Sequence, residues 1–578
     1  MNKTKTSFLQ DQRTSVFVLI GITLLVYCKA FFYDFSPMDE DWLIVRNQAY
    51  LSDWKNVITS FHDAIQGLYY RPVQMVSYII DYHLGGANAG IYHFTNVILH
   101  TISVVMLYKL LLEFKIEKPK VFFLSAIFSV HPIALHAVAW IPGRHDLLLC
   151  LFAISAFYHL IKYLKNKKIK HAILHFVFFL LALFTKENSI FLFPLFAFVF
   201  FIFPPVDKKK LVLFGIIWLL QMLVWHLMLT AVIKTTLTAG TDFFTTLKSF
   251  SYAMLMFIGK SFIPIHQSVS PISDTASVLA GVVVMLLIAF IWFKWGVADK
   301  KIALFGLGIY FGLLAVAVWF GSTLPTGEHL EHRIYTSMLG VIFLISQFNL
   351  DFNLRSTRMI FSLVIFLLAI KTFIRSSVYA DGISYLEEAV ADCPKNYFYH
   401  ARLGNFLYDK GRFNEALDRY NLAIALYDKK PQVFNDRANT FVKLNKKNEA
   451  VADYTKAYEL GKNPQVLLFR CQTFLMFKDY ENAYNDLVML QQCCASFIPK
   501  GMDREIITNV MTERLNTLNK IIEAEPNNAV LYVNRAKFFV DNRMGKEALA
   551  DLKKACELDP KNETYKGYFN ELNSSFPH

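Results

Sequence analysis

Three consecutive carboxylates, Asp39, Glu40 and Asp41, follow the first apolar run of this 578-residue chain. A carboxylate crowded by like charges and apolar walls has a raised pKa and can take a proton from a hydroxyl group. A cluster of acidic residues can also cap the helix that follows it. The motif therefore suggests a general base, with helix capping as the alternative interpretation.

Four cationic side chains lie in short polar motifs beside the apolar runs: Arg71, Arg144, Lys186 and Arg333. Arginine offers planar, paired donors that match phosphate oxygens, so the set suits a phosphate group. A local salt bridge is the alternative for the last three, because each has a carboxylate within two positions. These carboxylates are Asp146, Glu187 and Glu331.

Histidine, asparagine and tyrosine side chains complete the predicted pocket. His93, Asn96 and His100 share one helix face, and this spacing favours a hydrogen-bond ladder between helices over a metal site. His131 precedes a proline inside an apolar run, and Tyr335 ends a motif that begins at Glu331. A divalent cation bridging acids and phosphate is compatible with this chemistry, but the sequence defines no ligand set, and the seven cysteines form no zinc or disulfide pattern.

Long apolar helices must position these residues. The chain is 54% hydrophobic and 18% charged with a mean hydropathy of +0.34, which is typical of a polytopic membrane protein. A span needs about 20 apolar residues. Eleven spans are predicted, at Thr14–Phe32, Ile91–Glu113, Val121–Trp140, Leu147–Leu164, His171–Phe184, Ser189–Phe203, Leu211–Ile233, Ser277–Trp295, Ile302–Gly321, Ile334–Phe348 and Met359–Ile374. Val73–Leu84 and Ser251–Pro264 are shorter or more polar, and are predicted to be interfacial or re-entrant.

The charge distribution orients the membrane domain, predicted to be 1–375. It holds 32 basic and 19 acidic residues, whereas 376–578 holds 27 of each, so the whole net charge of +13 lies in the apolar part. The basic residues cluster in alternate short loops, as the positive-inside rule expects, which argues against a nucleic-acid partner. The N-terminus is expected in the cytoplasm, with the first outward loop at 33–72 and the C-terminal domain outside.

The C-terminal domain, 376–578, contains a repeat. Small residues recur twelve positions apart, and the spacing from Ala416 to Ala450 is 34, which is typical of tetratricopeptide (TPR) repeats. The small pairs begin at Gly404, Ala438, Cys471 and Ala536. A half-repeat is predicted at Tyr385–Pro394 and a degenerate repeat at Gln491–Glu525. The expected fold is all-α, a membrane helical domain followed by a TPR solenoid whose concave face binds peptide.

In this order the motifs resemble the transmembrane-and-TPR O-mannosyltransferase family and its bacterial relatives. The resemblance rests on the acidic motif at Asp39–Asp41, Tyr70-Arg71-Pro72, His93/Asn96/His100, Val130–Ile133 with Val138–Leu148, Lys186-Glu187 and Glu331/Arg333/Tyr335. The chain departs from it at Ala134 and His136, where family members usually carry a histidine and an acidic residue.

The resemblance implies a GT-C glycosyltransferase, a multi-span enzyme with its acidic catalytic residue in the first outward loop. It implies transfer of a hexose, mannose, from a polyprenyl-phosphate sugar to Ser/Thr hydroxyls of exported proteins, at a bacterial inner membrane. Asp39 or Glu40 would be the base, and a single displacement would invert the anomeric carbon. Two alternatives stay open: transfer of a lipid-linked glycan to a lipid or polysaccharide, and a non-catalytic membrane-anchored TPR scaffold for envelope assembly.

Overall fold

The computed structural model describes residues 8–36, 38–65, 69–205, 207–233, 242–271, 274–323 and 329–575. All regular elements in these ranges are helices, which confirms the predicted fold class. The chain forms two compact units, residues 1–402 and 403–578. The first unit therefore extends past the boundary expected at residue 375, since 376–402 pack with it.

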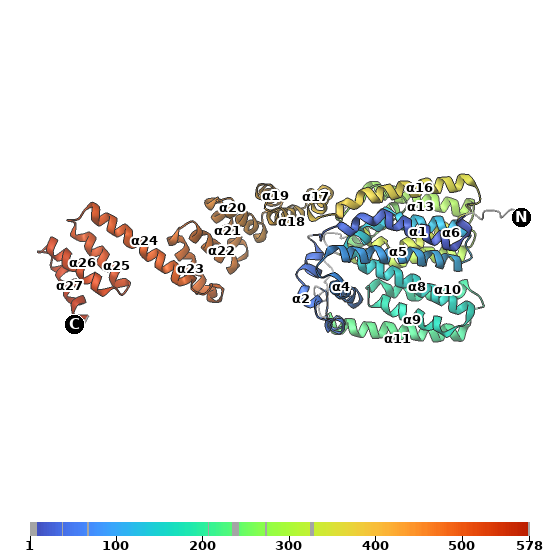
Figure 1. Ribbon diagram of the computed structural model, residues 1–578, viewed down its shortest axis with the longest axis horizontal. Helices are drawn as coiled ribbons and strands as arrows, with labels where there is room; N and C mark the ends of the chain where they lie inside the picture. Colours follow the sequence, from blue (N-terminus) through green and yellow to red (C-terminus); the bar gives the residue numbers. More distant parts are fainter. Residues whose placement is uncertain are drawn as a thin grey trace. The chain divides into compact units, whose positions relative to one another are not determined.

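The helices of the first unit form an apolar bundle (Figure 1). They are α1 Gln12–Tyr27, α2 Gln48–Leu51, α3 Asn56–Thr59, α4 Pro72–Gly85, α5 Ala89–Glu113, α6 Lys118–Val130, α7 Leu135–Ala139, α8 Arg144–Asn166, α9 Ile169–Leu183, α10 Leu192–Ile202, α11 Lys208–Val232, α12 Phe243–Phe262, α13 Thr275–Lys294, α14 Lys300–Thr323, α15 Met338–Ser346, α16 Arg355–Arg375 and α17 Gly382–Asp392, with short helical turns η4 Pro132–Ala134, η6 Glu187–Phe191, η7 Glu331–Ile334 and η8 Ser376–Tyr379.

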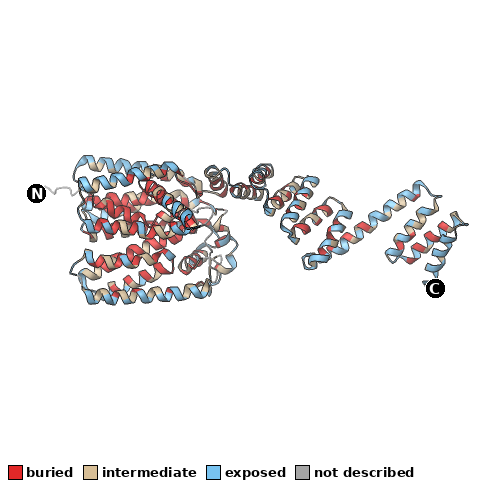
Figure 2. Ribbon diagram, turned by 180° about the vertical axis from the view of Figure 1, so that it is seen from behind, coloured by how far each residue is buried: buried red, intermediate tan, exposed pale blue. Residues whose placement is uncertain are grey.

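The number of spanning helices differs from the eleven predicted. Within the described residues, seven helices are long and apolar enough to cross a membrane, or eight if one bent pair is a single span. The predicted spans at 171–184 and 189–203 are shorter apolar helices, and α15 has only 9 residues. The outermost helices expose most of their apolar surface, as expected for contact with lipid (Figure 2).

The predicted span Val121–Trp140 is broken at His131-Pro132, and its second half is bent by 46° from the direction of the first. Proline cannot donate to the helix and restricts the residue before it, so α6 ends there. Thr372 donates from Oγ1 to the carbonyl of Val130 at 2.7 Å, which satisfies one of the carbonyls released by the break. Sequence reasoning treated this stretch as one straight span.

The helices of the second unit confirm the TPR repeat. They are α19 Phe413–Leu426, α20 Pro431–Lys443, α21 Lys447–Gly461, α22 Pro464–Met476, α23 Tyr480–Cys494, α24 Met502–Ala524, α25 Ala529–Asp541, α26 Gly545–Leu558 and α27 Glu563–Ser575, and α18 Tyr397–Asp409 precedes them. The small residues permit close helix packing: a Cβ at Gly404 would lie 2.7 Å from the Tyr420 ring. The stretch predicted as a degenerate repeat instead contains the single long helix α24.

Candidate active site

The turn that follows α7 holds the acidic loop against the bundle through a hydrogen bond of Ile141. The backbone N–H of Ile141 donates to Oε1 of Glu40 at 3.0 Å, and Ser36 donates to its other oxygen. Gly143 permits the tight turn after α7, because a Cβ there would lie 2.7 Å from the Ala137 carbonyl oxygen. The loop of residues 33–72 is thus held against the N-terminus of α8 by a carboxylate 101 positions away.

The three carboxylates of this loop have different surroundings. Glu40 is 1% exposed, and burial raises its pKa to about 8 against the lowering effect of its two backbone hydrogen bonds. Asp41 forms an ion pair with Arg46 at 2.7 Å. Asp39 is half-buried and close enough to Tyr385 for its charge to act on that hydroxyl. Glu40 and Asp41 thus hold the loop, and the assignment of Asp39 or Glu40 as the base stays a prediction.

Arg144 is completely enclosed. Its guanidinium lies 2.5 Å from Asp81 and donates to Oδ1 of Asn96 at 2.7 Å and to the Tyr92 carbonyl at 2.8 Å. The ring of Tyr78 lies 4.8 Å away. An arginine with 0% exposure and these partners is placed to join helices, not to receive a phosphate, so the phosphate role expected for Arg144 gives way to a positioning role.

Asp146 lies at the centre of a second buried cluster. It sits in the first turn of α8, where the helix dipole stabilises a negative charge. Lys186 donates to its Oδ1 at 2.6 Å, and Nδ1 of His332 donates to its Oδ2 at 2.7 Å. The Nε2 of His145 lies 3.1 Å from the same Oδ2. Side chains from α8, from the turn before η6 and from η7 therefore meet at one carboxylate.

Arg71 is partly exposed, whereas Arg144 and Lys186 are buried. It precedes α4 and forms a two-point contact with Glu187, with Nη2–Oε1 at 2.8 Å and Nε–Oε2 at 3.3 Å. It also lines a cavity of about 340 Å³ within the outward loop, together with Trp42, Tyr50 and Asp63. A guanidinium beside a polar and aromatic cavity suits an anionic sugar donor.

The remaining predicted charges belong to η7. Glu331 accepts from Nζ of Lys260 at 2.6 Å and from the backbone N–H of Ser268 at 2.9 Å. Arg333, two residues on, donates to the carbonyl of Ala317 at 2.8 Å. The pair Lys260–Glu331 is buried, so it fixes η7 between α12 and the segment that follows it.

The histidine and asparagine stripe of α5 forms the hydrogen-bond ladder that its spacing predicted. Nδ1 of His100 lies 2.7 Å from the hydroxyl of Tyr335, and Asn96 donates toward the Val138 carbonyl at 3.3 Å. Nε2 of His93 is 3.4 Å from the carbonyl of Asp34. His131 accepts from the backbone N–H of Ile133 at 3.2 Å and caps η4. The groups of α5 thus join this helix to the acidic loop at Asp34, to Val138 and to Tyr335.

Two of the local salt bridges considered from the sequence, Arg144–Asp146 and Lys186–Glu187, are replaced by long-range ion pairs. Arg144 pairs with Asp81 instead of Asp146, Lys186 with Asp146, and Arg71 with Glu187. Asp81 and Lys260 were missed. Both lie in the short stretches interpreted as interfacial, and the signal that could have found them was a charge inside an otherwise apolar segment.

The acidic loop and the start of the C-terminal segment lie at the same end of the bundle (Figure 1). The backbone N–H of Asp34 donates to the Ala380 carbonyl at 3.0 Å, and the Tyr33 hydroxyl to Oγ of Ser376 at 2.8 Å. The described start of α1 is at the opposite end. This arrangement supports the prediction that the loop and residues 376–380 share one side of a membrane.

Known proteins match both parts of the chain. A tetratricopeptide repeat family matches residues 431–463. Protein O-mannosyl-transferase F38B6.6 of Caenorhabditis elegans is 26% identical over 446 residues, which are 71% of this chain and 62% of that protein. Protein O-mannosyl-transferase Tmtc1 of Drosophila melanogaster is 30% identical over 121 residues, covering 21% of this chain and 14% of that protein.

The chain spans less than two thirds of the length of these curated relatives. Among solved structures, the TPR protein YrrB, titled as having an unusual peptide-binding site, aligns with 32% of this chain and 98% of its own, with 16% identity and a TM-score of 0.21. The sequence matches confirm the resemblance: the chain is a homologue of the transmembrane-and-TPR protein O-mannosyl-transferases, with helices of an integral membrane protein and a TPR solenoid.

Proposed function

We propose that this protein is a membrane glycosyltransferase that moves a hexose, mannose, from a polyprenyl-phosphate sugar to Ser/Thr hydroxyls of proteins on the outward side of a membrane. The observation that carries the proposal is the anchoring of an acidic loop, through Glu40 and Ile141, beside the N-terminus of α8. Arg71, Lys186 and their carboxylates lie at the same helix end.

Asp39 acts as the base in this proposal. It takes the proton of the acceptor hydroxyl as that oxygen bonds to the anomeric carbon, and the bond from that carbon to the phosphate oxygen breaks. The lipid phosphate leaves with the electron pair and needs no proton, so a cation suffices to stabilise it. Attack from the face opposite the phosphate inverts the anomeric carbon.

Arg71 receives the donor phosphate in this proposal. Its guanidinium already binds a carboxylate in the two-point geometry that a phosphate also accepts, and Glu187 is the more exposed partner. The neighbouring cavity, with Trp42, Tyr50 and Asp63, offers aromatic and hydrogen-bonding groups to a sugar. Arg144 and Lys186 position the surrounding helices through their buried ion pairs with Asp81 and Asp146.

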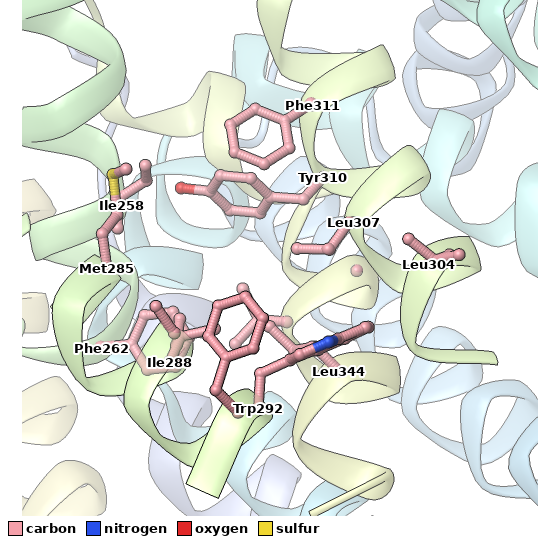
Figure 3. A pocket seen from close by; sticks show the side chains of 14 residues that line it. Ile258, Phe262, Met285, Ile288, Trp292, Leu304, Leu307, Tyr310, Phe311 and Leu344 are labelled. Atoms are coloured by element: carbon pink, nitrogen blue, oxygen red, sulfur yellow. The ribbon is translucent and has the colours of Figure 1, made fainter. Parts of the chain in front are cut away.

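An apolar cavity supports a lipid-linked donor. It has a volume of about 320 Å³ and lies among α12, α13, α14 and α15, with Ile258, Phe262, Trp292, Phe311 and Leu344 in its wall (Figure 3). Its surface suits an isoprenoid chain. Lys260, on the same helix as Phe262, pairs with Glu331, so one helix contributes to both the apolar cavity and the polar cluster.

Purified full-length protein in lipid nanodiscs tests the proposal. It is incubated with polyprenyl-phosphate mannose or polyprenyl-phosphate glucose, and with either a Ser/Thr peptide or an undecaprenyl-linked glycan as acceptor. We expect mannose on the peptide hydroxyl with inverted anomeric configuration. Transfer to the glycan alone would favour the ligase alternative, and no transfer from any lipid donor would favour the scaffold.

A further inference from the structure

The cluster around Asp146 contains more histidines than its hydrogen bonds use. His145 and His332 flank Oδ2 of Asp146, and the His332 and His136 rings lie 5.3 Å apart. Both ring nitrogens of His145 and of His136 are buried without a hydrogen-bond partner in the described part of the chain. A buried imidazole without a partner is costly unless something else occupies its lone pair.

We propose that His145, Asp146 and His332 bind a Zn²⁺ ion, and that His136, whose ring lies 5.3 Å from that of His332, moves toward these three residues to become the fourth ligand. One ligand atom from each of the first three residues lies within 4.8 Å of the other two. Imidazole nitrogens and a carboxylate oxygen are the ligands that zinc selects, at about 2.0–2.2 Å from the metal.

The distances are close to those of a coordinated ion. Around a tetrahedral zinc, neighbouring nitrogen and oxygen ligands are about 3.3–3.5 Å apart, given bonds of about 2.0–2.1 Å. Here Oδ2 of Asp146 is 2.7 Å from Nδ1 of His332 and 3.1 Å from Nε2 of His145. Insertion of the ion therefore requires each of these two nitrogens to move away from Oδ2 by less than about 1 Å, and it replaces the hydrogen bond from His332.

The backbone around the ligands is held from several sides. Arg144, one residue before His145, is fixed by Asp81 and Asn96. Glu331, one residue before His332, is fixed by Lys260. The chain is therefore fixed on the N-terminal side of His145 and of His332 by ion pairs of the preceding residues.

Lys186 opposes the ion and provides a specific test. Its ammonium group donates to Oδ1 of Asp146, so the metal uses the other oxygen, and the two positive charges repel each other across one carboxylate. Removal of the lysine charge should strengthen zinc binding. A purely hydrogen-bonded cluster would show no metal affinity for this change to alter.

The experiment uses full-length protein purified with a tag that contains no histidine, treated with a chelator and titrated with ZnCl₂. Zinc content is measured by mass spectrometry and affinity by competition with a chromophoric chelator. We expect about one zinc per chain in the wild type and in His62→Ala, an exposed histidine remote from the cluster in sequence. Substitution of a residue that only contacts a metal ligand typically weakens metal binding about 10–100-fold. His145→Ala and His332→Ala should weaken zinc binding by more than this, and Lys186→Met should strengthen it.

Stability in the metal-free state controls for misfolding: a variant counts only if it is monodisperse and its midpoint of thermal unfolding without zinc is measurable. His145→Ala is the milder variant, because Nδ1 of that ring has no hydrogen bond to lose among the described residues. The proposal would be overturned if the wild type held no zinc. It would also be overturned if His145→Ala and His332→Ala bound zinc with the same affinity as His62→Ala. Unchanged affinity in His136→Ala would overturn the assignment of the fourth ligand. Because zinc content is read without a transfer assay, these outcomes are independent of the proposed function.

Discussion

Nδ1 of His332 donates to Oδ2 of Asp146 at 2.7 Å, although 186 residues separate the two in the chain. The contact joins the N-terminus of α8 to η7. The hydroxyl of Thr336 adds a second link, donating to the backbone carbonyl of Asp146 at 3.2 Å. Polar residues from distant motifs are therefore brought to one end of a bundle of apolar helices, where they are buried and paired.

The buried pair Arg144–Asp81 predicts a strong stability effect. Asp81→Asn would leave the guanidinium without its counterion at 0% exposure, which costs about 3–5 kcal/mol for pairs of this kind. The double variant Asp81→Leu/Arg144→Met removes both charges and should regain most of that loss. Denaturant titration in mixed micelles measures both. Asp41→Asn, which loses a surface pair with Arg46, should cost about 1 kcal/mol or less. Equal losses for the single and the double variant would contradict the positioning role of Arg144.

Glu40 predicts a dependence of stability on pH. Burial raises its folded-state pKa from 4.5 to about 8, so between these values the folded chain holds a proton that the unfolded chain has released. The free energy of unfolding should therefore fall as pH rises through this window, by up to about 1.4 kcal/mol per unit, and this contribution should level off above about pH 8. Unfolding midpoints from pH 5 to 9 measure it.

Glu40→Gln removes the titration and should flatten this part of the profile. The variant should also be less stable at low pH, since an amide nitrogen would then face one of the backbone donors, Ser36 or Ile141. Asp41→Asn is the matched control in the same loop and should keep the wild-type slope. A Glu40→Gln slope equal to that of the wild type would show that Glu40 does not titrate in this window.

A ladder of arginine–aspartate pairs predicts the local stability of the solenoid. Each pair joins residues 16 positions apart, as in Arg437–Asp453, where Nε–Oδ2 is 2.6 Å. The others are Arg470–Asp486 and Arg535–Asp551. Arg437→Gln should speed amide exchange in α20 and α21, because a partly buried carboxylate loses its two-point partner. Hydrogen–deuterium exchange of the full chain measures this change. Arg412→Gln, in an exposed local pair, should change exchange little, and equal effects of both variants would contradict the prediction.

Membrane orientation can be tested with single cysteines at exposed positions in a cysteine-free background. Ser52→Cys in the outward loop and Lys395→Cys beyond α17 should both react with a membrane-impermeant thiol reagent in intact cells. Lys168→Cys, between α8 and α9, should react only after permeabilisation, because that loop is one of the basic loops expected inside. Labelling of Ser52→Cys and Lys395→Cys from opposite sides would contradict the shared outward face.

Local and periodic features were predictable from sequence. The small residues of the repeat are buried where its helices pack, as with the equivalent positions Ala416 and Ala450, both with 0% exposure, because only small side chains let two helices approach closely. The polar residues of α5 were also predictable, because helix geometry alone places His93, Asn96 and His100 on one face. Such features depend on neighbours a few positions away.

The partners of the charges were not predictable from sequence. Arg144 has Asp146 two positions away, yet it binds Asp81, because α8 carries the two side chains toward different neighbours. The break at Pro132 had a sequence signal, but its consequence, a backbone N–H at Ile141 that reaches Glu40, depends on how the helices pack. Pairing between residues far apart in the chain is decided by tertiary structure and produces no periodic pattern in the sequence.

Sugar transfer by Asp39→Asn tests the central claim most directly. The variant keeps the size of the side chain but cannot accept the proton of the acceptor hydroxyl, so kcat for mannose transfer to peptide should fall by about 10²–10⁴-fold with the KM for the donor little changed. Asp53→Asn, an exposed carboxylate of the same loop, should match the wild type. Undiminished kcat in a folded Asp39→Asn protein would contradict the account.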